Sequence, residues 1–257
     1  MTAVPDDDHG GDVEIVRLGR HRDDGDDDDG DLDRDDELLA AFHAGPYLDA
    51  FAHQREPLAV WQRRLRDPDA PYQLTVQIAG RALRDPSRRV LHGGVAYEWY
   101  PRSGCGLATY LVVTSPWRGR GLGRRLLTGA VDDLRARGAG RADGGDGAPV
   151  FGEIADPSAP GPGEDAAAAA ARLARFRRWG ARVVDAPYAQ PSLGPGLARD
   201  RHLRLLALAG TAPAPATIAG PRLAAFVREL FVANEGAPPD DELEALLAAI
   251  PATVVTR

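Results

Sequence analysis

The chain has a single cysteine, no lysine and no long apolar run, and each shortage excludes a class of protein. Cys105 alone can form neither an intramolecular disulfide nor a multi-cysteine metal site. No stretch approaches the roughly 20 apolar residues that a membrane-spanning helix needs. The first residues, MTAVPDDDHGGD, lack the basic start and the apolar stretch of an export signal. We therefore expect a cytoplasmic protein with no membrane partner.

Charge is distributed unevenly along the 257 residues. The formal net charge is −7, yet residues 1–37 hold 16 acidic residues against 4 arginines. The remaining 220 residues therefore carry a net charge of +5. We expect an acidic leader at 1–37, with a first strand at 13–18 and a mobile or solvated loop at 22–37, ahead of a mildly basic body. A basic body favours an anionic ligand.

The spacing of apolar residues predicts a mixed α/β domain at 38–212. Three- and four-residue spacing favours two helices over 38–66, with a break at Gly45-Pro46. One crossover helix among mostly antiparallel strands differs from the strict alternation of a doubly wound sheet. A linker and two amphipathic helices, at 221–234 and 240–250, form a tail at 213–257. The other predicted elements are strands at 72–79, 90–100 and 106–114, a helix at 121–137, a strand at 150–155, a helix at 165–179, and strands at 182–184 and 202–209.

The stretch YLVVTSPWRGRGLGRR, residues 110–125, carries the strongest chemical signal. An apolar strand runs into three glycines at alternate positions, and an amphipathic helix then begins. Glycines let backbone N–H groups turn toward one point, where the helix N-terminus adds unpaired donors and the positive end of its dipole. Such a turn binds phosphate or pyrophosphate. Positive charge is added around it by Arg118, Arg120, Arg124 and Arg125.

The glycine spacing narrows the kind of phosphate ligand. A P-loop needs a lysine, and G-x-G-x-x-G fails because Arg124 stands three residues after Gly121. The arrangement R-x-x-G-x-G after a strand resembles that of the GCN5-related N-acetyltransferase (GNAT) superfamily. The resemblance covers roughly residues 13–210 and includes FGEIADP and the helix-to-strand passage RLARFRRWGARVV. It implies a mixed, mostly antiparallel central sheet flanked by helices, and a site for acetyl-CoA.

The resemblance also implies roles for particular residues. In the family this motif holds the pyrophosphate of acetyl-CoA, and a bulge in the preceding strand opens a slot for the pantetheine arm. Backbone groups of Leu111, Val112 and Val113 would bond that arm and polarise the thioester carbonyl. Pro116 falls one position later than is usual in the family. The pyrophosphate would be held by Arg118, Gly119, Arg120, Gly121, Leu122, Gly123 and Arg124.

Acetyl transfer to an amine also needs proton transfer. Glu98 and Glu153 are strand carboxylates at positions where family members often place a base or a water-relayed base. The tyrosine that commonly serves as the acid is replaced here by Phe176. Tyr188 and Tyr110 are the substitutes, and a thiolate can also leave without an acid because its pKa lies only about a unit or two above neutral pH.

Three hypotheses of function follow. The first is an N-acetyltransferase that moves an acetyl group from acetyl-CoA to a primary amine of a small molecule or protein, by direct attack in a ternary complex. The replacement by Phe176 raises the second, a GNAT-fold module that binds acyl-CoA with weak or no catalysis. The tail helices raise the third, an oligomerising or partner-binding protein, and leave a homodimer open. The six histidines show no paired ligand spacing and no basic–aromatic interleaving is present, so we expect neither a metal nor a nucleic-acid partner.

Overall fold

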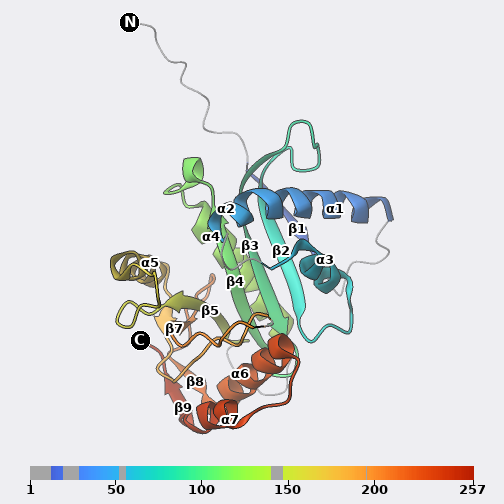
Figure 1. The fold of residues 1–257 in the computed structure, drawn as a ribbon. Coiled ribbons are helices and arrows are strands. Elements are labelled where there is room, and N and C mark those ends of the chain that lie inside the picture. The colour runs from blue at the N-terminus through green and yellow to red at the C-terminus, as the bar shows by residue number, and fades with distance from the viewer. Residues whose placement is uncertain (1–12, 20–28, 52–55, 140–146, 195) are drawn as a thin grey trace, which may run out of the picture.

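A mostly antiparallel sheet forms the centre of the molecule (Figure 1). The computed structural model describes residues 13–19, 29–51, 56–139, 147–194 and 196–257. Within these residues seven strands follow the order β1-β2-β3-β4-β5-β7-β6. All neighbours in the sheet are antiparallel except β4 and β5, which are joined by a crossover helix. The predicted fold class, mixed α/β with a mostly antiparallel sheet flanked by helices, is confirmed.

The strands predicted from the spacing of apolar residues agree well with the structure. Each predicted strand is present, with ends that differ by at most two residues from the prediction. The strands of the sheet are β1 (Glu14–Leu18), β2 (Gln73–Arg81), β3 (Val90–Tyr100), β4 (Cys105–Val113), β5 (Val150–Ala155), β6 (Arg182–Val183) and β7 (Leu203–Ala207). A second sheet, which the sequence did not predict, pairs β8 (Thr217–Ala219) with β9 (Thr253–Val255).

Helices cover both faces of the central sheet (Figure 1). None of the described helices combines the length and the apolar composition that crossing a membrane requires. The helical elements are α1 (Asp29–Phe42), the π-helix η1 (His43–Tyr47), α2 (Leu48–Ala50), α3 (Leu58–Arg66), the 3-10 turn η2 (Ser115–Trp117), α4 (Leu122–Gly138), α5 (Ala166–Arg178), α6 (Gly220–Glu235) and α7 (Asp241–Ala248).

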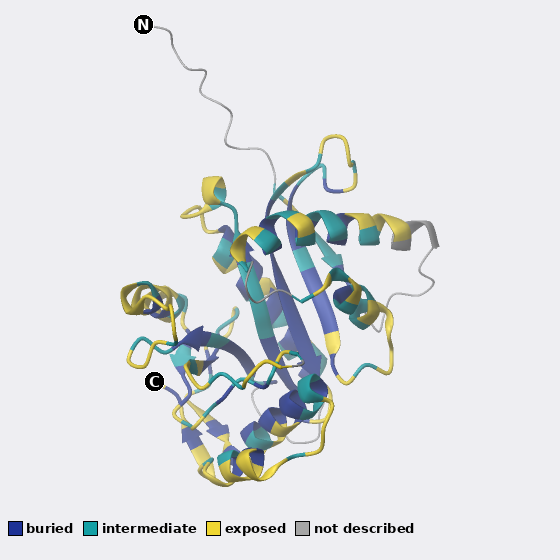
Figure 2. Cartoon of the chain, viewed as in Figure 1, coloured by how far each residue is buried: buried dark blue, intermediate teal, exposed yellow. Residues whose placement is uncertain are grey.

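Alternate residues of the central strands face two different helical layers. On one face Ala96 and Tyr100 of β3 belong to a core cluster with residues of α1, α3 and α6. On the other face Val95 and Tyr97 belong to a cluster with residues of α4 and α5. Figure 2 shows that β3 is buried along most of its length. The sheet is therefore covered on both sides, and its interior positions can fix side chains firmly.

The acidic segment ahead of the domain contains the strand β1 and, from Asp29 onward, a helix. The predicted mobile loop at 22–37 is wrong from Asp29 onward, where α1 begins, whereas residues 20–28 lie outside the described residues. Two features stabilise this helix against its own like charges. Its last turns bury Leu38, Leu39 and Phe42, and ion pairs link Asp35 to Arg84 and Asp36 to Arg66.

The predicted break at Gly45-Pro46 is also wrong. The chain stays helical through η1, with Pro46 inside it. Proline removes one backbone donor from a helix, and a π-helical turn is a local adjustment of the helical path. Pro46 and Tyr47 are both buried, so packing overrides the local breaker signal. The helical path ends instead near Phe51, whose φ is −128°.

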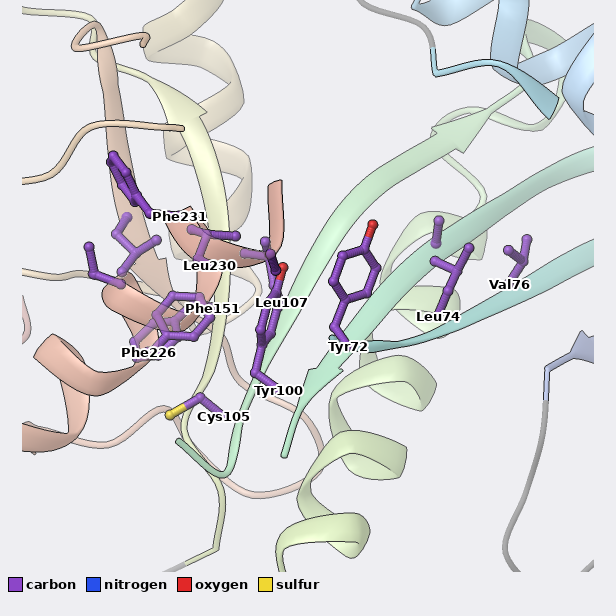
Figure 3. Packing of buried hydrophobic residues seen from close by; sticks show 14 of the residues in the cluster. Tyr72, Leu74, Val76, Tyr100, Cys105, Leu107, Phe151, Phe226, Leu230 and Phe231 are labelled. Carbon is purple, nitrogen blue, oxygen red and sulfur yellow. The ribbon is translucent and has the colours of Figure 1, made fainter. Parts of the chain in front are cut away.

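The C-terminal helix α6 shares the core of the sheet. Phe226 stacks on Phe151 of β5, with ring centroids 4.7 Å apart, and meets Tyr100 of β3 edge-on at 5.3 Å. Figure 3 shows these side chains gathered between α6 and the strands. The apolar stripe that raised the partner-binding hypothesis is thus covered within the chain. The predicted domain boundaries after residues 37 and 212 stay predictions, and so does the homodimer.

Replacing Phe226 by alanine tests whether α6 is part of this core. We expect Phe226→Ala to lower the free energy of unfolding by about 3–5 kcal/mol, because it leaves a cavity beside two aromatic rings. Urea denaturation measures the change. Leu197→Ala is the control, because that side chain is 61% exposed and we expect a change within about 0.5 kcal/mol. A loss below about 1 kcal/mol for Phe226→Ala would show that α6 is only loosely attached.

Candidate active site

The strands β4 and β5 separate in the middle of the sheet. Residues 106–108 of β4 pair in parallel with residues 150–152 of β5, and the ladder between them ends there. Beyond that point β4 continues with β3 and β5 with β7. One backbone edge of residues 109–113 therefore has no neighbouring strand among the described residues. A cavity of about 710 Å³ opens at the separation and reaches α6.

A β-bulge at Thr109 accounts for the divergence. Ala96 of β3 pairs with Tyr110, whereas the next residue, Tyr97, pairs with Ala108. Thr109 is thus one extra residue on β4. A bulge bends its own strand and increases the local twist, which reshapes a sheet beside an active site. The bulge that the resemblance implied for this strand is present.

The glycine turn that follows β4 is open to its surroundings. Gly119 and Gly121 have φ values of +79° and +84°, which glycine adopts far more readily than other residues. A Cβ atom built on either glycine would meet no atom within 4 Å. Gly121 is the N-cap of α4, and no side chain caps the helix there. Because the first turn of a helix has amide N–H groups without carbonyl partners one turn earlier, this turn presents a cluster of donors.

Arginine side chains surround this cluster of donors. Arg118 Nε donates a hydrogen bond to the carbonyl oxygen of Val113, at 2.9 Å, which ties the turn back to the end of β4. Arg118 is exposed and lines the cavity. Arg120 is also exposed, and its guanidinium lies 5.3 Å from the centre of the Trp117 ring. Positive charge and open amides thus occupy the same end of the cavity, a combination that binds anions.

Carboxylates occupy the interior of the cavity. Glu98 of β3 and Glu153 of β5 both line it. The Tyr100 hydroxyl donates to Glu98 at 2.6 Å. Glu153 accepts hydrogen bonds from the hydroxyl of Tyr188 and from Gln190 Nε2, the latter at 2.9 Å. Tyr188 therefore reaches the site through Glu153, although its own side chain is not part of the cavity wall.

Burial changes the protonation of these carboxylates. Removal from water raises the pKa of Glu98 from 4.5 to about 8. The hydrogen bond from Tyr100 opposes this rise, while the negative charges of Glu56 and Glu153 add to it. Burial also raises the pKa of Glu153 and of Glu56. A group with a pKa near 8 exchanges its proton close to neutral pH, as general acid–base chemistry requires.

Glu56 is a site residue that the sequence did not indicate. It lies between α2 and α3, lines the cavity, and accepts a hydrogen bond from Trp61 Nε1 at 2.9 Å. Gln190 and Asp200, from the connection between β6 and β7, line the cavity as well. These segments have no periodic pattern, so nothing local marked them. Tyr100 was detectable, because it lies two residues after Glu98 and a strand places both on one face.

The structure brings together only part of the predicted site. Phe176 lines the cavity and has no hydroxyl to donate. Tyr110 lines it too, among the rings of Tyr47, Phe51 and Trp61, and burial raises the pKa of its hydroxyl. Of the predicted acetyl-CoA contacts, Leu111 and Arg118 line the cavity. The others lie along β4 and at the start of α4: Val112, Val113, Gly119, Arg120, Gly121, Leu122, Gly123 and Arg124.

Two further chemistries find little support in the described part of the chain. Cys105 is the first residue of β4 and is buried. Burial raises the pKa of its thiol to about 11, which opposes nucleophilic reactivity. Among the described residues no group of three or more histidine, cysteine, aspartate and glutamate side chains is arranged to hold a metal ion.

The raised pKa of Glu98 predicts a pH-dependent stability. Between pH 4.5 and about 8 the folded chain holds a proton on Glu98 that the unfolded chain has lost, so this group lowers stability as pH rises. We expect Glu98→Gln to gain stability relative to the wild type across that window, by up to about 1.4 kcal/mol for each pH unit. Urea denaturation over the pH range measures the difference. A difference that does not change with pH would mean that Glu98 ionises normally.

This chain is similar to known acetyltransferases. Residues 36–143 match the model of the acetyltransferase (GNAT) family. A solved structure of a putative GNAT-family acetyltransferase from Bacteroides thetaiotaomicron is 15% identical, with a TM-score of 0.46 over 68% of this chain and 82% of that chain. The IAA acetyltransferase from Bacillus cereus is 15% identical, with a TM-score of 0.43 over 77% and 99% of the two chains. Comparison with curated protein sequences gave no significant match. The family match agrees with the resemblance seen in the glycine turn: residues 36–143 of this chain are similar to the acetyltransferase (GNAT) family.

Proposed function

We propose that this chain transfers the acetyl group of acetyl-CoA to an amine bound in the cavity between β4 and β5. One observation carries the proposal: the free edge of β4 after Thr109 leads directly into the open glycine turn before α4. A single elongated ligand can use both features, because its amide-containing arm can bond the free edge of β4 and its diphosphate can bind the glycine turn. The family match of residues 36–143 supports acetyl transfer as the reaction.

Each part of acetyl-CoA has a place in this proposal. The pantetheine arm adds to the open edge of β4 at Leu111, Val112 and Val113, much as an extended peptide adds to a sheet edge. The diphosphate binds the amides of residues 119–124, with Arg118 beside them. The acetyl carbonyl then lies against a backbone N–H of β4, which stabilises the negative charge that develops on its oxygen during attack.

In this proposal the carboxylates of Glu98 and Glu153 take part in proton transfer. Glu98 takes the proton that the acceptor ammonium must lose, directly or through a water, because its pKa of about 8 leaves it partly ionised near neutral pH. The neutral amine attacks the thioester carbon, the C–S bond breaks as the new C–N bond is completed, and the nitrogen loses its second proton to water. The thiolate leaves as such or takes a proton from Tyr188 by way of Glu153, which accepts the Tyr188 hydrogen bond.

Phe176 favours a second candidate function. It lines the cavity where a hydroxyl would serve as the acid, so the chain could hold acyl-CoA without transferring its acyl group. Release of free thiol from acetyl-CoA across a panel of primary amines separates the two functions. Tight binding of CoA with no thiol release from any amine would overturn acetyl transfer and leave the binding module.

Reversing the charge at Arg118 tests the position of the diphosphate. We expect Arg118→Glu to weaken acetyl-CoA binding about tenfold or more, because it places an anion beside the ligand's phosphates. Isothermal titration calorimetry measures the dissociation constant. Arg63→Glu makes the same charge change at an exposed residue of α3, away from the cavity wall, and we expect unchanged affinity. Equal affinity in both variants would mean that the phosphates bind elsewhere.

The pH dependence of the reaction tests the base. We expect kcat/KM of the wild type to rise with pH and to level off near 8, because only ionised Glu98 accepts the proton. Glu98→Gln keeps an acceptor for the Tyr100 hydrogen bond, yet we expect it to lower kcat about 100-fold or more and to remove this inflection. A variant with the same profile as the wild type would exclude Glu98 as the base. In that case the same measurement on Glu153→Gln examines the other carboxylate.

A further inference from the structure

The wall of the cavity holds far more acidic than basic side chains. Six carboxylates line it, against two arginines and one histidine. The six come from separate parts of the chain: Asp49, Glu56, Glu98, Glu153, Glu164 and Asp200. Glu164 is neutralised by Arg172, at 2.9 Å. In the described part of the chain, none of the other five carboxylates forms an ion pair.

Four of these carboxylates interact with one another. Glu98 responds to the charges of both Glu56 and Glu153, and Glu153 responds to that of Asp200. These four side chains, which all line the cavity, therefore form one cluster of interacting carboxylates. Within this group, Arg64 and His43 interact favourably with the carboxylate of Glu56. Arg118, on the wall of the cavity, is bonded at the end of β4 instead.

Asp49 differs from these four carboxylates because it is exposed. It belongs to α2 and also lines the cavity. In the described part of the chain its carboxylate accepts no hydrogen bond and forms no ion pair. By contrast, Asp200 accepts a hydrogen bond from the backbone N–H of His202 at 2.7 Å. Asp49 therefore offers an uncommitted negative charge on the exposed part of the cavity wall, its rim.

On the basis of the proposed function, we propose that the acceptor is a polycationic amine with at least two ammonium groups. One amine reacts beside Glu98 and Glu153, and a second ammonium group binds Asp49 and Glu56. An amine that reacts must first lose its proton and with it its positive charge. An acceptor with only one amine therefore leaves the cluster of carboxylates without a counter-charge. A second ammonium supplies that charge, whereas the carboxylate of an amino acid would be repelled.

A matched series of acceptors tests this assignment. Thiol release is measured with diamines from 1,3-diaminopropane to 1,8-diaminooctane, and with the 1-aminoalkane and the ω-amino acid of the same length. We expect kcat/KM of the best diamine, corrected for its two equivalent ends, to exceed that of its monoamine and amino acid about tenfold or more. High salt reduces the preference, because it screens the charges. Equal kcat/KM for diamines and monoamines would overturn the proposal.

Variants at the rim locate the second ammonium. We expect Asp49→Asn to raise KM for the best diamine about tenfold and to leave KM for the matched monoamine within about twofold. Asp69→Asn is the control, because Asp69 is exposed and lies away from the cavity wall. Glu56→Gln keeps an acceptor for Trp61 and supports the assignment if it also reduces the preference for diamines. Unchanged preference in both cavity variants would overturn the placement of the second ammonium.

A binding measurement separates this proposal from acetyl transfer itself. 1,6-Diaminohexane and 1-aminohexane are titrated calorimetrically into the full chain saturated with CoA. Tighter binding of the diamine, without thiol release from any amine, would support the charge assignment and overturn acetyl transfer. Thiol release without a preference for the diamine in either measurement would leave acetyl transfer intact and overturn the polycationic acceptor. Absence of both binding and thiol release would overturn both.

Discussion

The separation of β4 from β5 is the constraint on which the site depends. An extra residue at Thr109 bends β4 after only three paired positions with β5, so the sheet opens along its centre rather than at an edge. The two faces of the sheet stay covered by helices, and the opening is therefore held by a rigid surround. A backbone edge that would normally bond a neighbouring strand becomes available to an extended ligand. The crossover helix α4 then brings its own uncapped amides to the end of that edge.

Charge divides the cavity into two unlike ends. Open amides and arginines lie where β4 meets the glycine turn, whereas the carboxylates of Glu98, Glu153 and Glu56 lie on β3, on β5 and in the segment before α3. In the proposed reaction the donor is an anion and the acceptor a cation, so each end attracts one substrate and repels the other. Burial, with smaller contributions from the charges of Glu56 and Glu153, raises the pKa of Glu98 to about 8, which places it near the working range of a base. Tyr188, from the connection between β6 and β7, orients the neighbouring carboxylate of Glu153.

Local sequence patterns revealed the framework of this site, and tertiary contacts supplied the rest. Runs of apolar, β-branched and aromatic residues bounded by turn signals located β3, β4 and β5, because strands covered on both faces are apolar along most of their length. The positive-φ glycines of the turn were readable for a similar reason, since few other residues adopt that backbone. Pro46 misled the prediction, because burial of η1 outweighs a local breaker. Glu56 and the bond between Tyr188 and Glu153 join residues distant in sequence, and no periodicity encodes such a pair. The short strands β8 and β9 have only three residues each, too few to show a pattern.

Amide hydrogen exchange with and without CoA examines the open edge and the open turn together. In the free chain the uncapped amides at the start of α4 and those on the exposed edge of β4 exchange readily, because water reaches them. On addition of saturating CoA we expect slower exchange at residues 109–113 and 119–124, while the separate two-stranded sheet of β8 and β9 is unchanged. If CoA binds and exchange at both segments stays as fast as before, the ligand does not use this edge or this turn.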